Sequence, residues 1–525
     1  MNDINKRRTA LGIEFGSTRV KAVLLGEAHE VLAAGVYAWE NKLEGGYWTY
    51  SVEEIRAALG AAYAALKADV KEKYGVVLTH TGAIGISGMM HGYIALDKDD
   101  RLLVPFRTWR CGNAAAAAAE LTSVFGYKIP ARWTVAHLYQ AILNGEPHVK
   151  SIRRLTTLAG YVHARLTGES IVGVGEGSGI FPIDLATGDY DRRLIAAFEG
   201  LPAVRQAGVT LQPVLPRVLP AGREAGRLTA AGARLLDPDG DLAAGIPFCP
   251  PEGDAGTGMV ATGSVRRNTG NVSAGTSVFG MLVLEKDLKR VYDELDLVTT
   301  PSGDLVAMAH CNNCTSDINA WMGVFAELTA LVGGTVTGGA LYEKLFTKAL
   351  EGDPDCGGVL AYNYLSGEHA THVENGRPMV VRTTERKFNL ANLMRAHLLS
   401  AFATLKVGMD ILTREEGASI ARISGHGGIF KTKGVADRLL AAALNAPVSI
   451  SKTANEGGPF GMAVLAAYML SGAAQSLPDY LDEAVFKDAA VETAVPIQKD
   501  VDGFAAYMKK FIAGLAVERQ AGKSL

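Results

Sequence analysis

The stretch LGIEFGSTRVKAVLL, residues 11–25, consists of two apolar segments on either side of the small cluster Gly16-Ser17-Thr18. Apolar β-forming residues around a short Gly/Ser/Thr turn predict a strand, a tight turn and a second strand, which together form a hairpin. Such turns gather backbone N–H groups that can meet an anion. The carboxylate Glu14, however, stands just before this turn, and an anion site alone does not explain it.

The same arrangement returns in the other half of the chain. RNTGNVSAGTSVFGMLVL, residues 267–284, places Gly275, Thr276 and Ser277 between two β-like segments. One Gly-Thr-Ser turn is usually only a turn. Its repetition indicates two related halves that face each other. The Gly/Pro-rich text at residues 244–265 lies between these halves and predicts a domain boundary.

Helical and strand-like segments alternate along the chain. Residues 51–75 begin with the N-cap candidate Ser51, have Glu54 three residues later and end at Gly75, which predicts an amphipathic helix. The alanine run from residue 114 predicts a further helix start. A third glycine turn, residues 425–428, separates a predicted strand from a predicted helix. This alternation is typical of an α/β protein.

Composition narrows the class of protein. The 525 residues fit two or three domains, and 52 Lys plus Arg against 55 Asp plus Glu give a formal charge of −3. The densest basic block is only Lys6-Arg7-Arg8, so nucleic acid is not expected as the main partner. Five cysteines predict reduced thiols in the cytoplasm, and no apolar run is long enough to predict a membrane span.

Several polar residues are candidates for chemistry. Asp254 in PPEGDAGTG is either a turn-forming residue or a general base that a substrate hydroxyl can reach in a cleft. Met90 and His91 in SGMMHGY are either packing residues or part of a sugar site. Trp109 belongs either to the core or to a flat wall for a sugar ring. The CxxC pair Cys311 and Cys314 has no second metal-binding motif, so we expect ordinary thiols at a helix start.

Taken in order, these motifs resemble the FGGY family of carbohydrate kinases, within the sugar kinase, Hsp70 and actin superfamily. The resemblance extends from about residue 11 to about residue 470. The stretches that carry it are GIEFGSTRVKAVL, GISGMMHG, AGYVHARLTGE, GEGSGIFPID, GDAGTG, SAGTSVF, YLSGEH and SGHGG. Among family members, the Met-His-Gly turn most resembles that of xylulokinases.

The resemblance implies an α/β fold of two ribonuclease H-like (actin-like ATPase) domains around a deep cleft. It implies an N-terminal domain at residues 9–258 that binds sugar and carries the first phosphate turn. A C-terminal domain at residues 259–525 would then bind ATP. The implied reaction is transfer of the γ-phosphoryl group of ATP to a sugar hydroxyl, with Mg²⁺ as the second cofactor.

Residue by residue, the resemblance makes Asp254 the catalytic base. Met90, His91 and Trp109 fall at sugar-contacting positions. It places ATP phosphates and adenosine at three sets of residues: Gly16, Ser17 and Thr18; Gly275, Thr276 and Ser277; Gly427 and Gly428. Glu14 stands where the family usually has Asp and is expected to hold Mg²⁺ through water, which would explain its place beside a phosphate turn.

Departures from the family pattern concern the sugar. Ala255 follows the base where xylulokinases typically carry an Asn, and it cannot donate the corresponding hydrogen bond. Trp109 begins the run Trp-Arg-Cys-Gly-Asn in place of Trp-Asn-Asp-Gly-Arg. Because a polar site that loses one partner discriminates against its former ligand, these departures argue against D-xylulose itself. The expected class of substrate is still a ketopentose such as xylulose or a related ketose or polyol.

The alternative to a kinase is a second type of ATP-binding protein. A non-kinase ATPase switch of the actin/Hsp70 type would close on a protein rather than on a sugar. The sugar-side residues Met90, His91, Trp109 and Asp254 have no purpose in such a switch. A metal-dependent hydrolase has less support, because no HExxH or paired metal-ligand motif is present. The sequence does not determine the oligomeric state, and a homodimer is one expectation.

Overall fold

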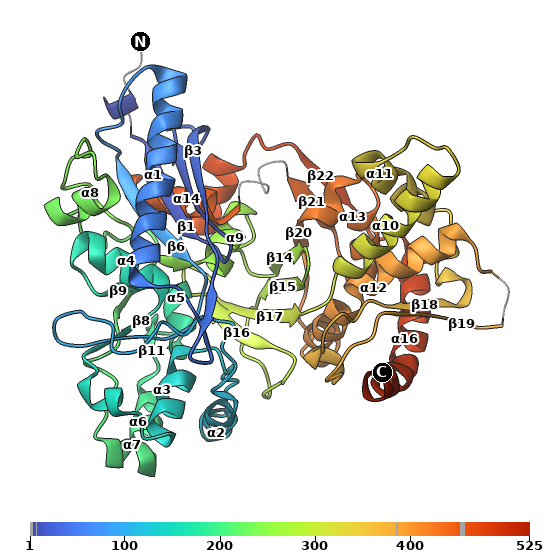
Figure 1. Cartoon of the computed structure of the whole chain (residues 1–525), viewed down its shortest axis with the longest axis horizontal. Coiled ribbons are helices and arrows are strands. Elements are labelled where there is room, and N and C mark those ends of the chain that lie inside the picture. Colours follow the sequence, from blue (N-terminus) through green and yellow to red (C-terminus); the bar gives the residue numbers. More distant parts are fainter. Residues whose placement is uncertain (1–3, 7, 385–386, 452–456) are drawn as a thin grey trace. The chain divides into compact units, whose positions relative to one another are not determined.

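The computed structural model describes residues 4–6, 8–384, 387–451 and 457–525 (Figure 1). By its internal contacts the chain divides into two compact units. The first comprises residues 1–265, 297–306 and 456–489, and the second comprises residues 266–296, 307–455 and 490–525. The segment 456–489 therefore belongs with the first unit, although the predicted domain 259–525 includes it. Two α/β units agree with the predicted fold class.

The first unit is organised around a five-stranded sheet of order β13-β6-β1-β2-β3. β1 (Ala10–Phe15) and β2 (Arg19–Leu25) form the predicted antiparallel hairpin, in which Glu14 lies opposite Lys21. β6 (Ala83–Gly88) runs parallel to β1 on its other side. The remaining strands of this sheet are β3 (Val31–Ala38) and β13 (Glu252–Gly253).

Helix α1 (Val52–Tyr74) forms as the sequence predicts. Ser51 and Glu54 exchange both hydrogen bonds of a capping box, and Gly75 ends the helix in the left-handed conformation. The helix lies on β2 and β3. Gly35 in β3 allows this approach, because a Cβ there would overlap the backbone of residues 62 and 66.

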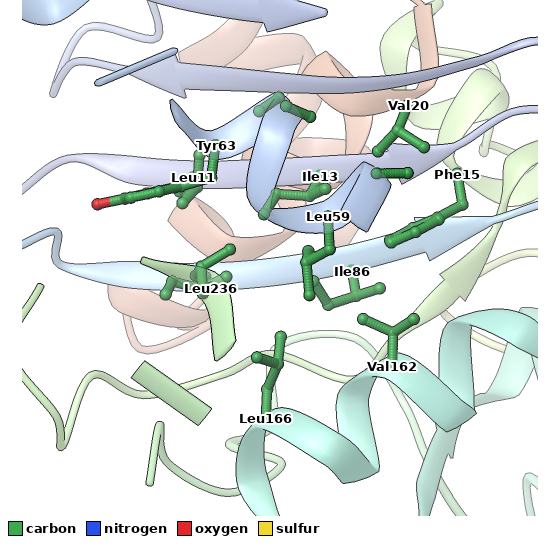
Figure 2. Close-up of a cluster of buried hydrophobic side chains, with 14 of the residues drawn as sticks. Leu11, Ile13, Phe15, Val20, Leu59, Tyr63, Ile86, Val162, Leu166 and Leu236 are labelled. Carbon is green, nitrogen blue, oxygen red and sulfur yellow. The ribbon is translucent and has the colours of Figure 1, made fainter. Parts of the chain in front are cut away.

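The main core of the first unit lies between the sheet, α1 and α4 (Leu158–Thr167) (Figure 2). Alternate residues of β1 contribute to it, because successive side chains of a strand point to opposite faces. The labelled members in Figure 2 are Leu11, Ile13, Phe15, Val20, Leu59, Tyr63, Ile86, Val162, Leu166 and Leu236. Burying aliphatic and aromatic side chains of this size contributes about 1.5–3 kcal/mol each.

Helix α14 (Gly457–Leu470) packs on β1, β2 and β6, although all three strands end by residue 88. Glycines make the approach possible: a Cβ on Gly12 would overlap the backbone of Pro459 and Ala463. In the same way, Gly461 lies against the backbone of Thr257 in α9 (Asp254–Ala261). The sequence predicts this glycine-led helix from the stretch that begins at residue 455. Residues 455 and 456 lie outside the described ranges, and so does Arg7 of the N-terminal basic block.

The other elements of the first unit surround this sheet. Its further helices are α2 (Ala115–Phe125), α3 (Thr134–Leu143), α5 (Val174–Ser178), α6 (Arg192–Glu199), α7 (Pro202–Ala207), α8 (Ala230–Leu236) and α15 (Leu477–Tyr480). Two-stranded sheets pair β4 (Lys42–Glu44) with β5 (Tyr47–Thr49), β7 (Ile94–Leu96) with β8 (Arg154–Thr156), β9 (Ile171–Gly173) with β12 (Arg217–Leu219), and β10 (Ile183–Asp184) with β11 (Asp189–Tyr190).

The second unit repeats the arrangement of the first hairpin. β14 (Thr269–Ala274) and β15 (Val278–Val283) are antiparallel, and β20 (Arg422–His426) runs parallel to β14. The sheet order is β16-β17-β15-β14-β20-β21-β22. Its other strands are β16 (Asp296–Thr299), β17 (Leu305–Cys311), β21 (Val448–Ser451) and β22 (Val491–Ala494); residues 297–299 of β16 and residues 305 and 306 of β17 fall in the ranges of the first unit. The prediction of two related halves is confirmed at the level of these hairpins.

Five α-helices and a two-stranded sheet complete the described part of the second unit. The helices are α10 (Ser316–Leu331), α11 (Gly338–Ala349), α12 (Leu390–Asp410), α13 (Ala436–Leu444) and α16 (Gln498–Ser524); the sheet pairs β18 (Val359–Tyr362) with β19 (Met379–Arg382). None of the helices in the described ranges combines the length and apolar character that crossing a bilayer requires.

Candidate active site

The turn between β1 and β2, residues 16–18 (the first turn), has all three of its carbonyl groups hydrogen-bonded. The Gly16 N–H donates to the Arg19 carbonyl at 3.0 Å and closes the hairpin. The Trp39 indole N–H donates to the Gly16 carbonyl at 2.7 Å, and the Trp39 backbone N–H donates to the Thr18 carbonyl at 3.1 Å. One tryptophan thus occupies two of the three carbonyls.

Tyr50 occupies the third carbonyl of the first turn. Its hydroxyl donates to the Ser17 carbonyl at 2.6 Å, and its ring stacks on Trp39 with centroids 4.0 Å apart. Within the described chain, the backbone N–H groups of Ser17 and Thr18 donate to no protein acceptor. Because the carbonyls are occupied and these donors are not, the turn can present N–H groups to a phosphate.

Glu14 lies in β1, two residues before the first turn, and is only partly exposed. Burial and the nearby charge of Asp254 raise the pKa of Glu14 to about 7, and Lys21 opposes that shift. Gly458, at the start of α14, makes room for the carboxylate, since a Cβ there would lie 2.5 Å from Oε1. A carboxyl group whose proton affinity is raised by burial and by a neighbouring carboxylate favours a cation beside it.

The donor set suits Mg²⁺ better than a transition metal. Across the described residues, no group of three or more His, Cys, Asp or Glu side chains is arranged to hold a metal ion. Mg²⁺ needs fewer protein ligands, because it keeps several waters and is usually held by one or two carboxylates together with substrate phosphates. Glu14, with Asp254 near it, fits that requirement.

Asp254 is the first residue of α9 and directly follows β13. Its Oδ1 accepts a hydrogen bond from the Met90 backbone N–H at 3.3 Å, and the side chain remains partly exposed. Burial raises the pKa of Asp254, while hydrogen bonds from backbone N–H groups, that of Met90 first, oppose the rise. A partly exposed carboxylate of raised pKa is suited to accept a proton from a hydroxyl group.

Met90 and His91 belong to the turn whose backbone contacts Asp254. Both are 5% exposed, and His91 adopts a left-handed φ of 70° in the turn that follows β6. The His91 ring is stacked on Trp133 at a centroid distance of 6.1 Å. Only a small part of either side chain is therefore accessible, whereas the backbone of this turn reaches the base directly.

Trp109 is 38% exposed, so it is not a core residue. Its indole N–H donates to the Ser17 hydroxyl oxygen at 3.2 Å. The neighbouring Arg110 lies over the Trp48 ring, 3.8 Å from its centroid, which fixes the segment. The predicted sugar wall is therefore hydrogen-bonded to the predicted phosphate turn.

Two buried carboxyl groups near Asp254 were missed by the sequence analysis. Glu252 accepts hydrogen bonds from the backbone N–H groups of Gly175 at 3.3 Å and Glu176 at 2.9 Å. Burial raises the pKa of Glu252 to about 8, and burial, with the charges of Glu252 and Asp254 added, raises the pKa of Glu176 well above its ordinary value. Only their glycine-rich surroundings, GEGSG and PPEGD, could have indicated them.

These two carboxyls fix the strand that leads to the base. A Cβ on Gly253 would lie 2.6 Å from Glu176 Oε2 and would overlap Met90, so only glycine fits between them. Glu252 in turn holds the start of α5. The backbone immediately before Asp254 is therefore confined by α5 on one side and by the Met90 turn on the other.

The turn between β14 and β15, residues 275–277 (the second turn), is closed by the Gly275 N–H donating to the Ser277 carbonyl at 2.9 Å. The Thr276 carbonyl accepts from the Cys314 N–H at 3.0 Å, and the Gly275 carbonyl accepts from both the backbone N–H and the hydroxyl of Thr315, at 3.1 Å and 2.7 Å. Gly275 and Thr276 are exposed. This turn, too, has its carbonyls occupied.

Gly427 lies directly against the second turn's strand. It adopts a φ of 119°, and a Cβ there would overlap the Ala274 carbonyl, so both conformation and space require glycine. Gly428 begins a short turn and is exposed. The preceding residue, His426, has its pKa lowered to about 4 by burial and is neutral.

The cysteines of the CxxC pair are buried and free, as are the other three. Burial raises the pKa of both Cys311 and Cys314 above the ordinary thiol range. Cys314 contributes its backbone N–H, not its sulfur, to the second turn. This agrees with the prediction of ordinary thiols just before the helix α10.

The structure thus collects the candidate residues in two groups. In the first unit, Asp254 contacts the Met90 turn and shapes the electrostatics of Glu14, while Trp109 contacts the first turn. In the second unit, Gly427 lies against the strand that enters the second turn.

Comparisons with known proteins cover both units. Residues 9–260 match the family profile described as the N-terminal domain of the FGGY family of carbohydrate kinases, and residues 270–470 match that of its C-terminal domain. A xylulose kinase of Haemophilus influenzae is 23% identical over 445 residues, covering 80% of this chain and 83% of the relative.

Solved structures show the same fold with differently named enzymes. A gluconate kinase from Lactobacillus acidophilus superimposes with a TM-score of 0.79 at 16% identity, covering 99% of this chain and 100% of the other. A ligand-bound xylulose kinase from the same organism gives a TM-score of 0.78 at 16% identity, covering 98% and 99%.

Proposed function

The chain belongs to the FGGY family of carbohydrate kinases, and we propose that it transfers the γ-phosphoryl group of ATP to a ketopentose such as xylulose or to a related ketose or polyol. The observation that carries the proposal is the position of Asp254, a partly exposed carboxylate held by the Met90 N–H and electrostatically coupled to Glu14 beside the first turn. The similarity to xylulose kinases supports the choice of sugar class.

Asp254 acts as the general base in this proposal. It accepts the proton of the attacking hydroxyl, and the Met90 N–H keeps one of its oxygens oriented while the other faces the substrate. Its raised pKa makes it a stronger base, but only the ionised form can act. Turnover should therefore fall as the pH is lowered through that raised pKa.

Backbone N–H groups receive the phosphates. The free donors of Ser17 and Thr18 in the first turn and those of the exposed second turn suit the spread negative charge of a transferred phosphoryl group. Mg²⁺, when bound, neutralises charge on the phosphate oxygens, and Glu14 is the residue that would hold it, through water. Gly427 and Gly428 form the proposed adenosine turn.

The sugar side of the site is assigned to the Met90-His91 turn and to the exposed indole of Trp109. Ala255 provides no hydrogen bond beside the base, so the preferred sugar is expected to differ from one that needs an amide at that point. We assign sugar binding to residues 9–258 and ATP binding to residues 259–525. The free thiols support a cytoplasmic location; a homodimer stays a prediction.

The direct test is release of ADP by the purified protein, with Mg²⁺ and ATP, across a panel of ketoses, aldoses, polyols and gluconate. We expect strong stimulation by one sugar or a small related group. Asp254→Ala should lower sugar-dependent turnover by about 10²- to 10⁴-fold, with little change in the thermal unfolding midpoint.

Asp99→Ala, which removes an exposed carboxylate far along the sequence from the base, is the matched control. ADP release that no sugar stimulates would favour the ATPase switch. Near-normal kinase activity of Asp254→Ala would refute the assignment of the base.

A further inference from the structure

The hydrogen bond between Trp109 and Ser17 connects two sites that the proposed function treats separately. Trp109 Nε1 and Ser17 Oγ are 3.2 Å apart. The indole is partly exposed, and the hydroxyl belongs to the first turn. The contact joins residues more than 90 positions apart in the sequence.

We propose that Trp109 is a positioning residue that orients the Ser17 hydroxyl toward the phosphate in the first turn, so that a sugar lying on the indole sets a phosphate donor. The inference rests on the proposed kinase function and deepens it. It names a route by which occupation of the sugar site affects phosphoryl transfer.

The direction of the bond follows from the chemistry of the two groups. An indole N–H can only donate, whereas a serine hydroxyl can donate one proton and accept at two lone pairs. Trp109 therefore fills an acceptor position of Ser17 Oγ and leaves the hydroxyl proton for another acceptor. Beside the N–H groups of Ser17 and Thr18, that acceptor is an oxygen of the bound phosphate.

The remainder of the first turn is fixed without Trp109. Its three carbonyls are held by Trp39 and Tyr50, which are 8% and 1% exposed. The Ser17 side chain is thus a rotatable group on a rigid backbone. A single bond from Trp109 is enough to choose its orientation.

The exposed part of the indole is the means by which a sugar acts. A sugar ring packed against the indole restricts the motion of Trp109 and so maintains the bond to Ser17 Oγ. Without sugar, an indole that is 38% exposed has more freedom. Transfer to the sugar hydroxyl is therefore favoured over transfer to water, because the donor is set when the acceptor is present.

A double-mutant cycle tests the proposal. Trp109→Phe keeps an aromatic ring but removes the N–H, and we expect kcat to fall about fivefold, the effect of one hydrogen bond, with a smaller change in the KM for sugar. Ser17→Ala should lower kcat about tenfold or more, because it removes a donor to a charged group. The double variant should match Ser17→Ala within about twofold, because both changes act through the same hydroxyl.

Trp39→Phe is the matched control for loss of an indole N–H at the same turn. The Trp39 indole N–H donates to the Gly16 carbonyl and not to the Ser17 hydroxyl. The effect of Trp39→Phe on kcat should therefore multiply with that of Ser17→Ala. If the effects of Trp109→Phe and Ser17→Ala also multiply, or if Trp109→Phe changes only the KM for sugar, the positioning role is refuted.

A second measurement does not depend on turnover. The ¹⁵N–¹H resonance of the Trp109 indole, assigned by its loss in Trp109→Phe, should move when MgADP and phosphate are added to the wild-type protein. It should not move in Ser17→Ala. A resonance that stays unmoved while calorimetry detects the nucleotide overturns the inference and leaves the kinase assignment intact. Absence of sugar-dependent ADP release instead refutes the proposed function. In that case the shift of the Trp109 indole resonance still tests whether the Trp109–Ser17 hydrogen bond responds to phosphate.

Discussion

The first and second turns have the same backbone plan but different chemistry. Each joins two antiparallel strands, and each is flanked by a parallel strand, β6 beside β1 and β20 beside β14. Two residues before the first turn stands Glu14, opposite Lys21. The equivalent position of the second hairpin is Ser273, opposite Phe279. Only the first hairpin brings a charge to its turn.

This difference supports a proposed division of work between the two hairpins. A turn with free N–H groups attracts phosphate whether or not a carboxylate is near. A carboxylate beside it opposes the phosphate unless a cation is present, so the first hairpin suits phosphate with Mg²⁺ and the second suits phosphate alone. The coupling between Glu14 and Asp254 has no counterpart among the shifts described for the second turn.

The two turns are also held differently. In the first turn, the side chains of Trp39 and Tyr50 hold two of the three carbonyls, and the Trp39 backbone N–H holds the third. The second depends on the backbone N–H groups of residues 314 and 315 and on the Thr315 hydroxyl. Side-chain substitutions can therefore loosen the first turn more readily than the second.

The largest effect is expected from removing the charge that distinguishes the hairpins. Glu14→Gln should lower kcat about 10- to 100-fold at limiting Mg²⁺, as loss of an outer carboxylate does at other metal sites. Glu14→Asp keeps the charge and the residue type usual in the family, so it should retain most activity. The measurement is initial rate against Mg²⁺ concentration.

Ser273→Ala is the control at the second hairpin and should change the rate less than about twofold, since it removes no charge. Equal losses in Glu14→Gln and Ser273→Ala would break the proposed division between the hairpins.

A smaller effect of Glu14→Gln is expected on stability: the substitution that lowers kcat should make the protein more stable at high pH. The pKa of Glu14 is about 7 in the folded protein against an ordinary 4.5, so the folded state holds the proton of this carboxyl group more tightly than the unfolded state does. The contribution of Glu14 to the free energy of unfolding is therefore fully present below pH 4.5 and is lost as the pH rises through 7. Without Mg²⁺ at pH 8, Glu14→Gln should therefore have a free energy of unfolding about 1–3 kcal/mol higher than that of the wild type, and so a higher unfolding temperature. At pH 4.5 the two proteins should differ little.

Thermal unfolding at both pH values, in EDTA, makes this measurement. Addition of Mg²⁺ at pH 8 should narrow the gap, since the ion stabilises the ionised carboxylate of the wild type. A gap of the same size at both pH values would contradict the raised pKa.

The smallest effects concern how the turns are held. Tyr50→Phe removes the hydrogen bond to the Ser17 carbonyl and should destabilise the protein by about 1 kcal/mol. Thr315→Val removes the side-chain bond to the Gly275 carbonyl, which the Thr315 N–H still serves, so its cost should be smaller. Thermal unfolding of both variants compares them, and a larger loss in Thr315→Val would reverse the ranking.

The sequence predicted the local features of both hairpins and of α1. Glycine turns between β-forming residues and a capping box are short-range signals, and they decide these elements almost alone. The resemblance added the roles of Asp254 and Glu14, which no local pattern contains. Their roles as base and metal ligand stay predictions.

The unpredicted features are contacts between distant segments. Trp39 and Tyr50 look like ordinary core aromatics, and nothing in their neighbourhood indicates that they occupy turn carbonyls. Glu176 and Glu252 carry no spacing pattern, because their partners are backbone groups of another segment. The membership of α14 in the first unit depends on glycines at positions 12 and 461, whose purpose is visible only when the backbones meet.

That last feature affects how the protein is made. The sheet face of the first unit that α14 covers exists once residue 265 has been synthesised, but the helix begins only at residue 457. At about 5–20 residues per second, about 10–40 s of synthesis separate the two. During that time α1 can already pack against Gly35, whereas α14, the helix that packs against Gly12, has not yet been synthesised. The nascent chain therefore leaves this sheet face uncovered, and open to chaperones and to other nascent chains, until residue 470 has left the ribosome.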